Sequence, residues 1–470
     1  MSAGLVRWAE QEFGATELGD VRRTRRLVAM AAGAARRPSG RVSEVFDRAR
    51  EREGAYDFLE SPHIDAATLA ASVFAATASR ARDMGLVHVA IDGSSLNLTD
   101  DNGAKGFGPV GSPNTPAKGL IVMNALAVTR DGVPLGLIDQ HFWSRAPTEE
   151  LSPAARTKRN QLKAFEEKET HRFAEAARSA SERLETVGAK AWVVIDREGD
   201  NQDILFALHE VGCLFTVRAR WNREQWNSKD KVRQALDAES PLGRFELEVG
   251  RTGRRAARTA IVELRATQVS VRFRATPHHG VRGLRLFAVQ IREVTDDESG
   301  LDWLLYTNAP VVSAEHAQQV IESYRARWRI EEFHRTWKQG ECNVEDAQLR
   351  SEEAVIRWAT LLSAVATRIE RLKYLARRTP KAPASLEFAT EEIVALKLDQ
   401  RRRLLPKRRK LPEMPTISEA TAWVAELGGW IGPRNGPPGS TTLARGLERL
   451  GYLVEGIALA RHLQADRRPT

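Results

Sequence analysis

The segment YRARWRIEEFHRTWK, residues 324–338, is the most informative part of the sequence. Its polar residues recur at steps of three or four positions, the spacing that lines side chains along one face of a helix. The members of this face are Tyr324, Arg327, Glu331, Arg335 and Lys338. We predict one helix over 324–338, with apolar anchorage from Trp328, Phe333 and Trp337. One carboxylate among several cations suits a face that meets a phosphodiester and a metal ion, although a solvated helix with ion pairs shows the same pattern.

The composition of the chain favours an acidic partner. The 470 residues carry a net charge of +9, and the sequence pI is near 9.7. Such a balance is typical of proteins that bind nucleic acid and less often of proteins that bind an anionic membrane surface. Two cysteines cannot cross-link a chain of this length, which indicates a reducing cytoplasm. The first residues lack the pattern of a signal peptide, and no apolar run is long enough to span a membrane.

Residues 1–80 read as a helical DNA-binding domain. The segment 21–43 contains seven arginines and no acidic residue, and it has an apolar side made mostly of alanine. Such a helix suits bidentate contacts to the phosphate backbone of DNA, with a basic face that has no partner as the alternative. A membrane-surface helix is disfavoured because the apolar side lacks aromatic residues. The candidate DNA contacts in its first turns are Arg22, Arg23, Arg25 and Arg26.

Two buried strands are expected to end on a carboxylate. VHVAID, residues 87–92, ends on Asp92, and AWVVID, residues 191–196, ends on Asp196. Such ends lie at the carboxyl edge of a sheet, where the ligand sites of α/β folds tend to be. Each acid alone could be a cap or an ion-pair partner, but with Glu331 they form the minimum set for two divalent metals. Carboxylate oxygens suit Mg²⁺, and two such ions can promote the in-line displacement at a phosphodiester.

The span between Asp196 and Glu331 is longer than a compact core needs. It contains four strand-like segments, at 244–250, 259–275, 284–294 and 301–307. We predict an antiparallel β insertion over about 220–307 that extends the surface available to a DNA duplex. Trp303 lies in the last of these strands, where it either packs in the core or stacks on a displaced base.

The remaining residues, 346–470, return to helical spacing. A basic run at 397–410 has eight basic residues against one acid and is expected to be a connection or a phosphate contact. The predicted organisation is therefore a helical domain over 1–80, a catalytic α/β core over 81–345 and a helical C-terminal region over 346–470, where dimerisation is expected.

These motifs resemble a known family. Tyr324, Arg327, Glu331 and Lys338 match the Y-x2-R-x3-E-x6-K signature of the bacterial insertion-sequence transposases of the fourth group, which include the transposase of transposon five. Residues 8–32 and 54–62 resemble the N-terminal module of the family. Residues 89–96, 193–200 and 303–310 are similar to blocks of its catalytic core, and 427–432 is similar to a C-terminal block.

The resemblance implies a ribonuclease-H-like core with an Asp-Asp-Glu (DDE) triad, here Asp92, Asp196 and Glu331. This triad would bind two Mg²⁺ ions per active site, with Mn²⁺ as a substitute. Tyr324, Arg327 and Lys338 would hold phosphates near the cleavage point. The resemblance further implies that Trp303 stacks on a flipped base and that Arg218 contacts DNA.

The activity implied by the resemblance is cut-and-paste DNA transposition. The enzyme would bind the inverted repeats at transposon ends, cleave them through a hairpin intermediate and join the 3′ ends to target DNA. It would act as a homodimer in a synaptic complex, in the cytoplasm and associated with the nucleoid, without a membrane partner. Two alternatives stay open: a metal-dependent nuclease on the same core without strand transfer, and an inactive relative that binds DNA ends and inhibits.

Overall fold

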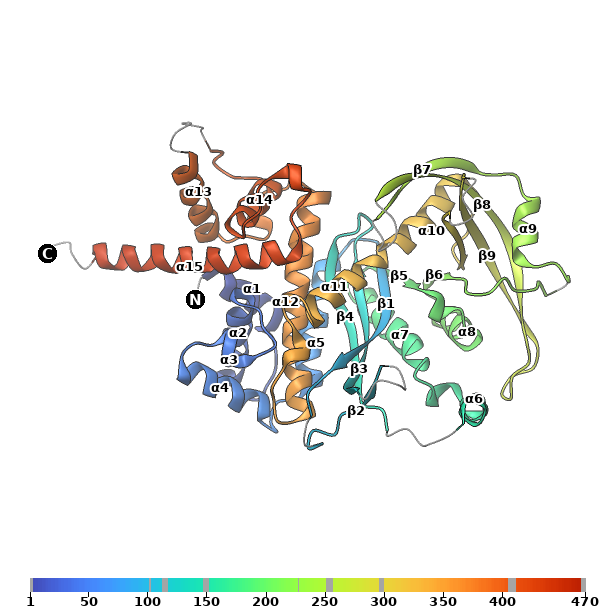
Figure 1. Ribbon diagram of the computed structural model, residues 1–470, viewed down its shortest axis with the longest axis horizontal. Coiled ribbons are helices and arrows are strands. Elements are labelled where there is room, and N and C mark those ends of the chain that lie inside the picture. Colours follow the sequence, from blue (N-terminus) through green and yellow to red (C-terminus); the bar gives the residue numbers. More distant parts are fainter. Residues whose placement is uncertain are drawn as a thin grey trace.

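The computed structural model describes residues 3–100, 103–111, 117–146, 152–226, 228–250, 257–295, 300–404 and 411–465. A mixed ten-stranded sheet runs through the middle of the molecule, and helical N-terminal and C-terminal regions lie together on one side of it (Figure 1). The strand order is β2-β3-β1-β5-β6-β10-β9-β8-β7, and β4 also pairs with β3. The predicted fold class, an α/β core with flanking helical regions, is confirmed.

The core of the sheet has the ribonuclease-H-like arrangement of three antiparallel strands beside two parallel ones. The antiparallel strands are β1 (Leu86–Asn97), β3 (Ala117–Val128) and β4 (Pro134–Trp143). The parallel strands are β5 (Lys190–Ile195) and β6 (Leu214–Arg218), and β5 lies next to β1. The short strand β2 (Gly108–Val110) pairs with the start of β3.

The prediction that the first strand stops at Asp92 is wrong. Strand β1 continues to Asn97, because its antiparallel partner β3 remains paired with it as far as Gly119. The parallel pairing of β1 with β5 ends earlier, at Ala90 and Val194. Strand β5 does end directly before Asp196, as expected.

The predicted antiparallel insertion is present, and it continues the central sheet. Its strands are β7 (Gly243–Val249), β8 (Arg258–Phe273), β9 (Arg282–Glu293) and β10 (Asp302–Thr307). Each pairs with the next in antiparallel fashion, and β10 joins the core by pairing with β6. Side chains of β8 alternate between buried and more exposed positions, as expected for a strand with one covered face.

Helices cover both faces of the core strands. One face packs against α11 (Trp328–Lys338) and α12 (Glu352–Arg378), and the other packs against α7 (His171–Glu185) and α8 (Gln202–Val211). Helix α10 (Ala314–Ala326) packs on a third cluster, with residues of β5, β8, β9 and β10. Because both faces are covered, the strands of the core are apolar over most of their length.

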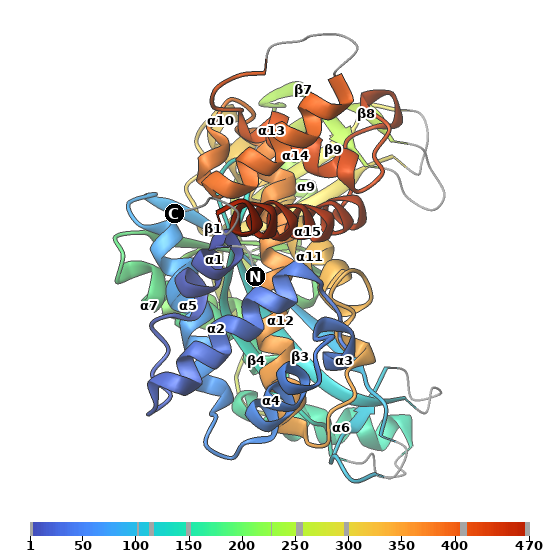
Figure 2. The same cartoon turned by 90° about the vertical axis from the view of Figure 1, so that its left-hand side faces the viewer.

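The helical regions at the two ends of the chain share one hydrophobic core with α11, α12 and one face of the sheet. The N-terminal helices are α1 (Ala3–Phe13), α2 (Val21–Arg36), α3 (Val42–Val45), α4 (Ala49–Glu60) and α5 (Ala66–Ala81). The C-terminal helices are α13 (Thr390–Leu404), α14 (Ile417–Leu427) and α15 (Ser440–Ala465). Helix α15 crosses the molecule beside the N-terminal helices (Figures 1 and 2). The boundary expected near residue 80 falls at the end of α5, before β1, and the boundary expected near residue 345 falls between α11 and α12. Both lie within one shared hydrophobic core.

Two further helices lie around the core, α6 (Pro153–Leu162) and α9 (Val232–Ala238). Of the basic run at 397–410, the part up to Leu404 belongs to α13. The rest of that run, 405–410, lies outside the described residues.

The single helix predicted over 324–338 is in fact two helices that meet at Arg327. The backbone N–H of Arg327 donates to the carbonyl of Tyr324 (3.2 Å), and the N–H of Ile330 donates to the carbonyl of Arg327 (3.0 Å), which is the tighter three-residue pattern. The expected anchorage by Trp328 is also wrong, because this side chain is 59% exposed. The buried stripe of α11 follows Ile330, Phe333 and Trp337 at helical spacing, and Trp328 lies off that stripe.

Candidate active site

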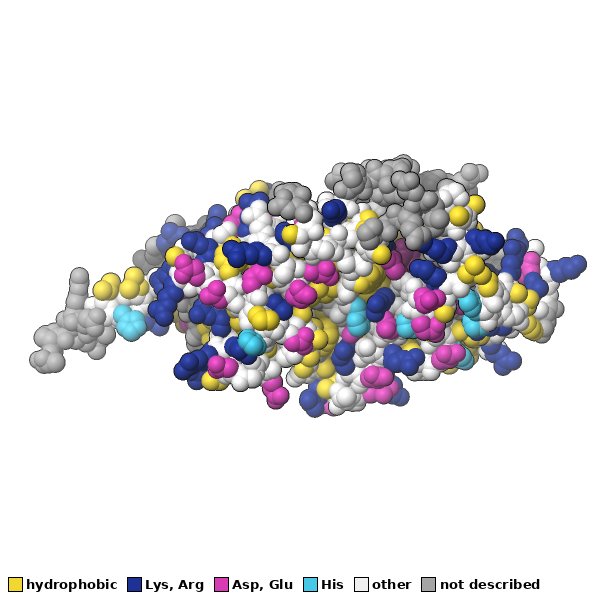
Figure 3. Space-filling view, turned by 90° about the horizontal axis from the view of Figure 1, so that it is seen from below, with side chains coloured by type: hydrophobic (Ala, Val, Ile, Leu, Met, Phe, Trp, Pro, Cys, Tyr) yellow, Lys and Arg dark blue, Asp and Glu magenta, His cyan; other side chains and the backbone are white. Residues whose placement is uncertain are grey.

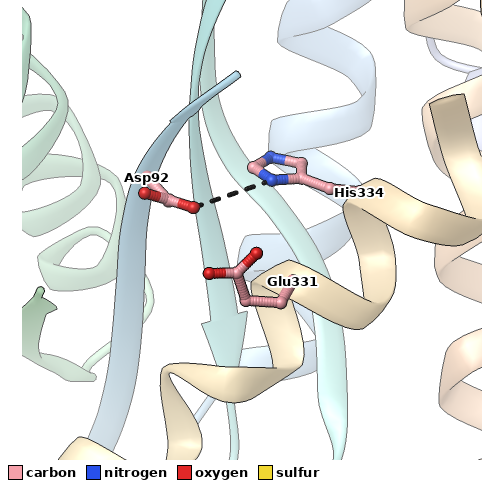
Figure 4. A group of neighbouring side chains, drawn as sticks. All are labelled: Asp92, Glu331 and His334. Carbon is pink, nitrogen blue, oxygen red and sulfur yellow. Dashed lines mark ion pairs between the residues drawn. The ribbon is translucent and has the colours of Figure 1, made fainter. Parts of the chain in front are cut away.

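Three side chains from two elements meet beside the middle of β1. Asp92 projects from β1, and Glu331 and His334 project from α11, so that one ligand atom of each lies within 4.8 Å of the others (Figure 4). Glu331 and His334 are three residues apart, which places both on the same side of the helix. Helix α11 packs against β1 through its buried stripe, and this packing brings the two residues to the carboxylate.

The environment of Asp92 disfavours the ionised form of its carboxyl group when no cation is bound. Burial raises the pKa of Asp92 from 3.8 to about 7, Arg327 opposes this shift, and the negative charges of Glu331 and Asp196 add to it. A divalent cation bound among these oxygens would remove the repulsion and favour the ionised form. The residues present therefore fit a divalent metal.

Asp196 lies at the same edge of the sheet, although it is not one of the three residues within 4.8 Å of one another. The last paired residues of the β1–β5 ladder are Ala90 and Val194, so Asp92 and Asp196 each follow two residues later in the same register. Both acids lie beyond the end of this ladder, and the charge of Asp196 contributes to the raised pKa of Asp92. One oxygen of Asp196 accepts the backbone N–H of Glu198 (2.8 Å) and caps the turn that follows.

The two adjacent glutamates of α11 have different partners. The side chain of Glu331 is 39% exposed and lies near Asp92, whereas that of Glu332 is 15% exposed and faces α12. Glu332 is held by Arg329 (3.0 Å), Lys373 (3.4 Å) and the hydroxyl of Tyr374. Glu331 is therefore the glutamate that is available to a metal.

Three family models match consecutive parts of the chain. Residues 6–64 match a family model described as transposase DNA-binding, residues 166–367 match the transposase DDE domain, and residues 364–466 match the transposase Tn5 dimerisation domain. The three ranges follow the order N-terminal helices, catalytic core and C-terminal helices. This chain belongs to the Tn5-like DDE transposases. The DDE match includes Asp196 and Glu331, and it begins after the strand that carries Asp92.

Membership of this family establishes the general activity. The transposase is a DNA-binding enzyme of the class that cleaves DNA and transfers strands with divalent metal ions, and its C-terminal region carries the dimerisation domain. Across the described residues, no helix of the transposase is both long enough and apolar enough to cross a membrane.

Two basic residues of the signature lie beside the acids. Arg327 is buried, with its guanidinium 3.1 Å from Glu331 and 3.9 Å from Asp92. Lys338, at the C-terminal end of α11, donates to the hydroxyl of Ser94 (3.0 Å) on β1. In the DNA-free transposase Arg327 thus offsets the charge of Asp92 and Glu331, and Lys338 lies 3.7 Å from the carboxylate of Glu345.

An aromatic cluster lies where α10 meets the β insertion. The ring of buried Tyr324 contacts the ring of Trp303 edge-on, with 5.2 Å between centroids. The guanidinium of Arg218 lies 5.6 Å from the centroid of Trp303, in a cation–π arrangement. Strand pairing between β6 and β10 brings Arg218 and Trp303 together. The half-buried Trp303 thus packs in the core on one side, as one of the two interpretations of the sequence expected.

The N-terminal arginines belong to a separate surface on α2. Arg22, Arg25 and Arg26 are the more exposed members, whereas Arg23 donates to the carbonyl of Leu18 (3.1 Å) and supports the turn before the helix. Figure 3 shows Lys and Arg spread over one face of the molecule and mixed with Asp and Glu. Among the described residues of that face, no uniformly basic patch marks a path for DNA.

The place of His334 was not predicted from the sequence. This imidazole is buried, and burial lowers its pKa from 6.5 to about 3, so the ring is neutral. The signal that could have revealed it is the Glu-x-x-His spacing of Glu331 and His334, which recurs in carboxylate metal sites on helices. A second residue that was not predicted is Asn124, an amide within the otherwise apolar segment of β3.

Proposed function

We propose that this transposase cuts and pastes a DNA element: it binds the inverted repeats at both ends, cleaves them through a hairpin intermediate and joins the 3′ ends to target DNA. The observation that supports this proposal most is the convergence of Asp92 and Asp196 at one edge of the sheet with Glu331 on α11. Asp92 and Glu331 lie within 4.8 Å of each other, and Asp196 directly follows the neighbouring strand β5. Arg327, a cation able to hold phosphate, lies beside Asp92 and Glu331.

Asp92, Asp196 and Glu331 would hold two Mg²⁺ ions, for which Mn²⁺ could substitute. These ions would supply a water or 3′-hydroxyl of lowered pKa and would neutralise the charge of the leaving oxygen. Oxygen-only ligands favour Mg²⁺ over softer metals. The buried Asp92 would bind as the ionised carboxylate, since the cation would offset the repulsion from Glu331 and Asp196.

The neighbouring basic residues would position the DNA. Arg327 pairs with Asp92 and Glu331 in the DNA-free state, and its planar guanidinium is equally suited to two phosphate oxygens. Lys338 and Tyr324 would hold the phosphates on either side. Trp303 and Arg218 would receive the displaced base and its phosphate when the hairpin forms, because their contact places a ring and a cation together.

The two ends of the chain would assemble the complex. In the N-terminal domain, residues 1–80, the exposed arginines of α2 would hold the end repeats of the DNA. The C-terminal region, residues 346–470, would pair two subunits. Residues 81–345 would carry the catalysis. In a synaptic complex of two subunits, each would cut the end that its partner mainly binds. The reaction would take place in the cytoplasm on nucleoid DNA.

The test is a cleavage assay on duplexes that carry the inverted repeats flanking the coding region, with wild type and with Asp92→Ala and Asp196→Ala. We expect hairpins and strand-transfer products with Mg²⁺ for wild type, and loss of cleavage by both variants with end binding kept within severalfold. Cleavage without hairpins or joined products would support a nuclease instead. A variant that still cuts with Mg²⁺ would remove that residue from the triad.

A further inference from the structure

A chain of buried polar side chains leads from α12 to the acidic site. The hydroxyl of Thr360 lies 3.3 Å from Oε1 of Gln140, and Nε2 of Gln140 donates to Oδ1 of Asn124 (2.8 Å). Nδ2 of Asn124 lies 3.0 Å from Nε2 of His334, whose Nδ1 faces Oδ2 of Asp92 at 3.8 Å. Thr360, Gln140, Asn124 and His334 are each less than 9% exposed. No step of the proposed cleavage and joining reactions uses these four residues.

The direction of these contacts fixes the tautomer of His334. The amide oxygen of Asn124 accepts from Gln140, so the amide nitrogen of Asn124 faces the imidazole, and an amide nitrogen can only donate. Nε2 of His334 must therefore accept and carries no proton. A neutral imidazole has one N–H, which is consequently on Nδ1, the nitrogen that faces Asp92.

We propose that His334 is a positioning residue for Asp92: its Nδ1–H orients the carboxylate, and the amides of Asn124 and Gln140 hold the ring in that tautomer. The proposal rests on the proposed role of Asp92 as a metal ligand. Although His334 lies within 4.8 Å of both acids, it is not a ligand in this arrangement, because Nδ1 carries a proton and the lone pair of Nε2 is used by Asn124.

The distance between His334 and Asp92 fits this role. At 3.8 Å the contact is longer than a hydrogen bond, and such contacts often tighten only when the reacting complex forms. A small rotation of the carboxylate would bring Oδ2 within bonding distance and leave Oδ1 free for a cation. Removing a residue that hydrogen-bonds to a metal ligand typically weakens metal affinity by about 10- to 100-fold.

The tautomer can be observed directly by long-range ¹H–¹⁵N spectroscopy on transposase labelled with ¹⁵N-histidine. The signals of His334 are assigned by their loss in His334→Asn. We expect a protonated Nδ1 and an unprotonated Nε2, both without Mg²⁺ and with it. An unprotonated Nδ1, or a change of Nδ1 to a metal-bound nitrogen when Mg²⁺ is added, would overturn the proposal.

A matched pair of variants separates positioning from packing. Asparagine keeps an N–H near the position of Nδ1, whereas leucine fills the space without a donor. Calorimetric titration with Mn²⁺ is expected to show binding about tenfold weaker or worse for His334→Leu, and within about threefold of wild type for His334→Asn. Equal weakening in the two variants, or unchanged binding in His334→Leu, would contradict a role through the donor.

Two further variants keep the test decisive. Asn124→Leu leaves His334 in place but removes the amide that selects its tautomer, so we expect a lower population of the Nδ1–H form and weaker Mn²⁺ binding. An unchanged tautomer would exclude the amide chain as its cause. Asp92→Asn tests the proposed function separately: Mn²⁺ binding equal to wild type in this variant would show that Asp92 is not a ligand, whatever the state of His334.

Discussion

At the scale of single residues, two adjacent glutamates illustrate how environment assigns a role. The side chain of Glu331 lies near Asp92 and is partly exposed to solvent. The side chain of Glu332 is instead enclosed by Arg329, Lys373 and Tyr374. The charge of Glu332 is thus compensated by cations from two helices, and its removal would leave Arg329 without its carboxylate partner and Lys373 with Glu370 alone. Glu331 has Arg327 as its partner in the DNA-free state.

Glutamine substitutions at these two positions are expected to separate catalysis from stability. Glu331→Gln should abolish cleavage and change the free energy of unfolding by less than about 1 kcal/mol, because the pair with Arg327 is partly exposed. Glu332→Gln should lower the free energy of unfolding by about 2–3 kcal/mol, because it breaks a buried ion pair. Urea denaturation and a cleavage assay measure the two effects. The reverse assignment, with Glu332 essential for cleavage at unchanged stability, would contradict the proposed site.

The pH dependence of the free energy of unfolding is expected to reveal the raised pKa of Asp92. Its pKa is 3.8 in an unfolded chain and about 7 in the fold. Between these values the unfolded chain has released the proton and the native chain has kept it, so the free energy of unfolding falls as the pH rises through this window. The contribution is fully present below pH 4 and is absent above pH 7, with an upper limit of about 4 kcal/mol.

Asp92→Asn removes this pH-dependent decline, so the variant should be more stable than wild type at pH 8 and similar to it near pH 4. Mg²⁺ should stabilise wild type at pH 8 and should have little effect on the variant, because a ligand stabilises only a fold that binds it. Urea denaturation at both pH values, with and without Mg²⁺, measures this. A variant less stable than wild type at pH 8 would contradict the repulsion inferred for Asp92.

At this scale the ends of two strands predicted Asp92 and Asp196, and helical spacing predicted Glu331 and the basic residues of the signature. The structure brings Asp92 and Glu331 together. The sequence did not predict the environment of Glu332 or the contacts of His334. Their partners, Lys373 and Asn124, are more than 40 and 200 positions away along the chain. Only the packing of α11 against α12 and β3 decides which neighbours they meet.

At the scale of elements, the helix predicted at 324–338 and the strand predicted at 87–92 show that sequence periodicity alone does not determine where an element ends. The buried stripe with Phe333 and Trp337 followed from spacing, but the junction at Arg327 did not, because no proline or glycine marks it. Likewise, β1 extends past Asp92 because β3 continues to pair with it, and pairing partners are not encoded in the strand itself. The antiparallel insertion was predictable because its strands have strong local patterns.

Helix α2 offers a test of the DNA-binding element. Replacing Arg22 and Arg26 with alanine should weaken binding to end DNA and reduce the slope of log affinity against log salt by about 1 for each phosphate that is no longer bound. Arg23→Ala is the matched control, since this arginine bonds the carbonyl of Leu18, and it should leave the salt slope unchanged. Fluorescence anisotropy over a salt series measures both. An unchanged slope in the double variant would move the DNA-binding surface to another element.

At the scale of the whole molecule, helix α15 contacts α2, the helix proposed to bind DNA. Arg36 of α2 lies 3.0 Å from Glu455, and Arg37 lies 3.7 Å from Glu448, both glutamates being in α15. Helix α15 thus places two negative charges against the basic end of α2. This contact joins the first and last parts of the sequence, so local patterns could not predict it, although each helix was expected.

Removing those charges is expected to strengthen DNA binding. Glu448→Gln with Glu455→Gln should raise the affinity for non-specific duplex severalfold at low salt and make the salt dependence steeper, because Arg36 would lose its carboxylate partner and Arg37 would keep only Asp47. Stability should change little, since both pairs are partly exposed. Anisotropy titrations measure the affinity, and an affinity equal to that of wild type at every salt concentration would show that these arginines lie away from the DNA.

Asp92, Asp196 and Glu331 are proposed to bind the divalent metals used in cleavage, and every proposed step of the reaction depends on them. Anomalous diffraction at the manganese edge, from crystals of the transposase bound to end DNA and soaked in Mn²⁺, tests this most directly. The expected result is two Mn²⁺ peaks between the three carboxylates, with an Asp92 oxygen coordinated to at least one of them. Peaks at other residues, with none beside Asp92, would contradict the proposed metal site.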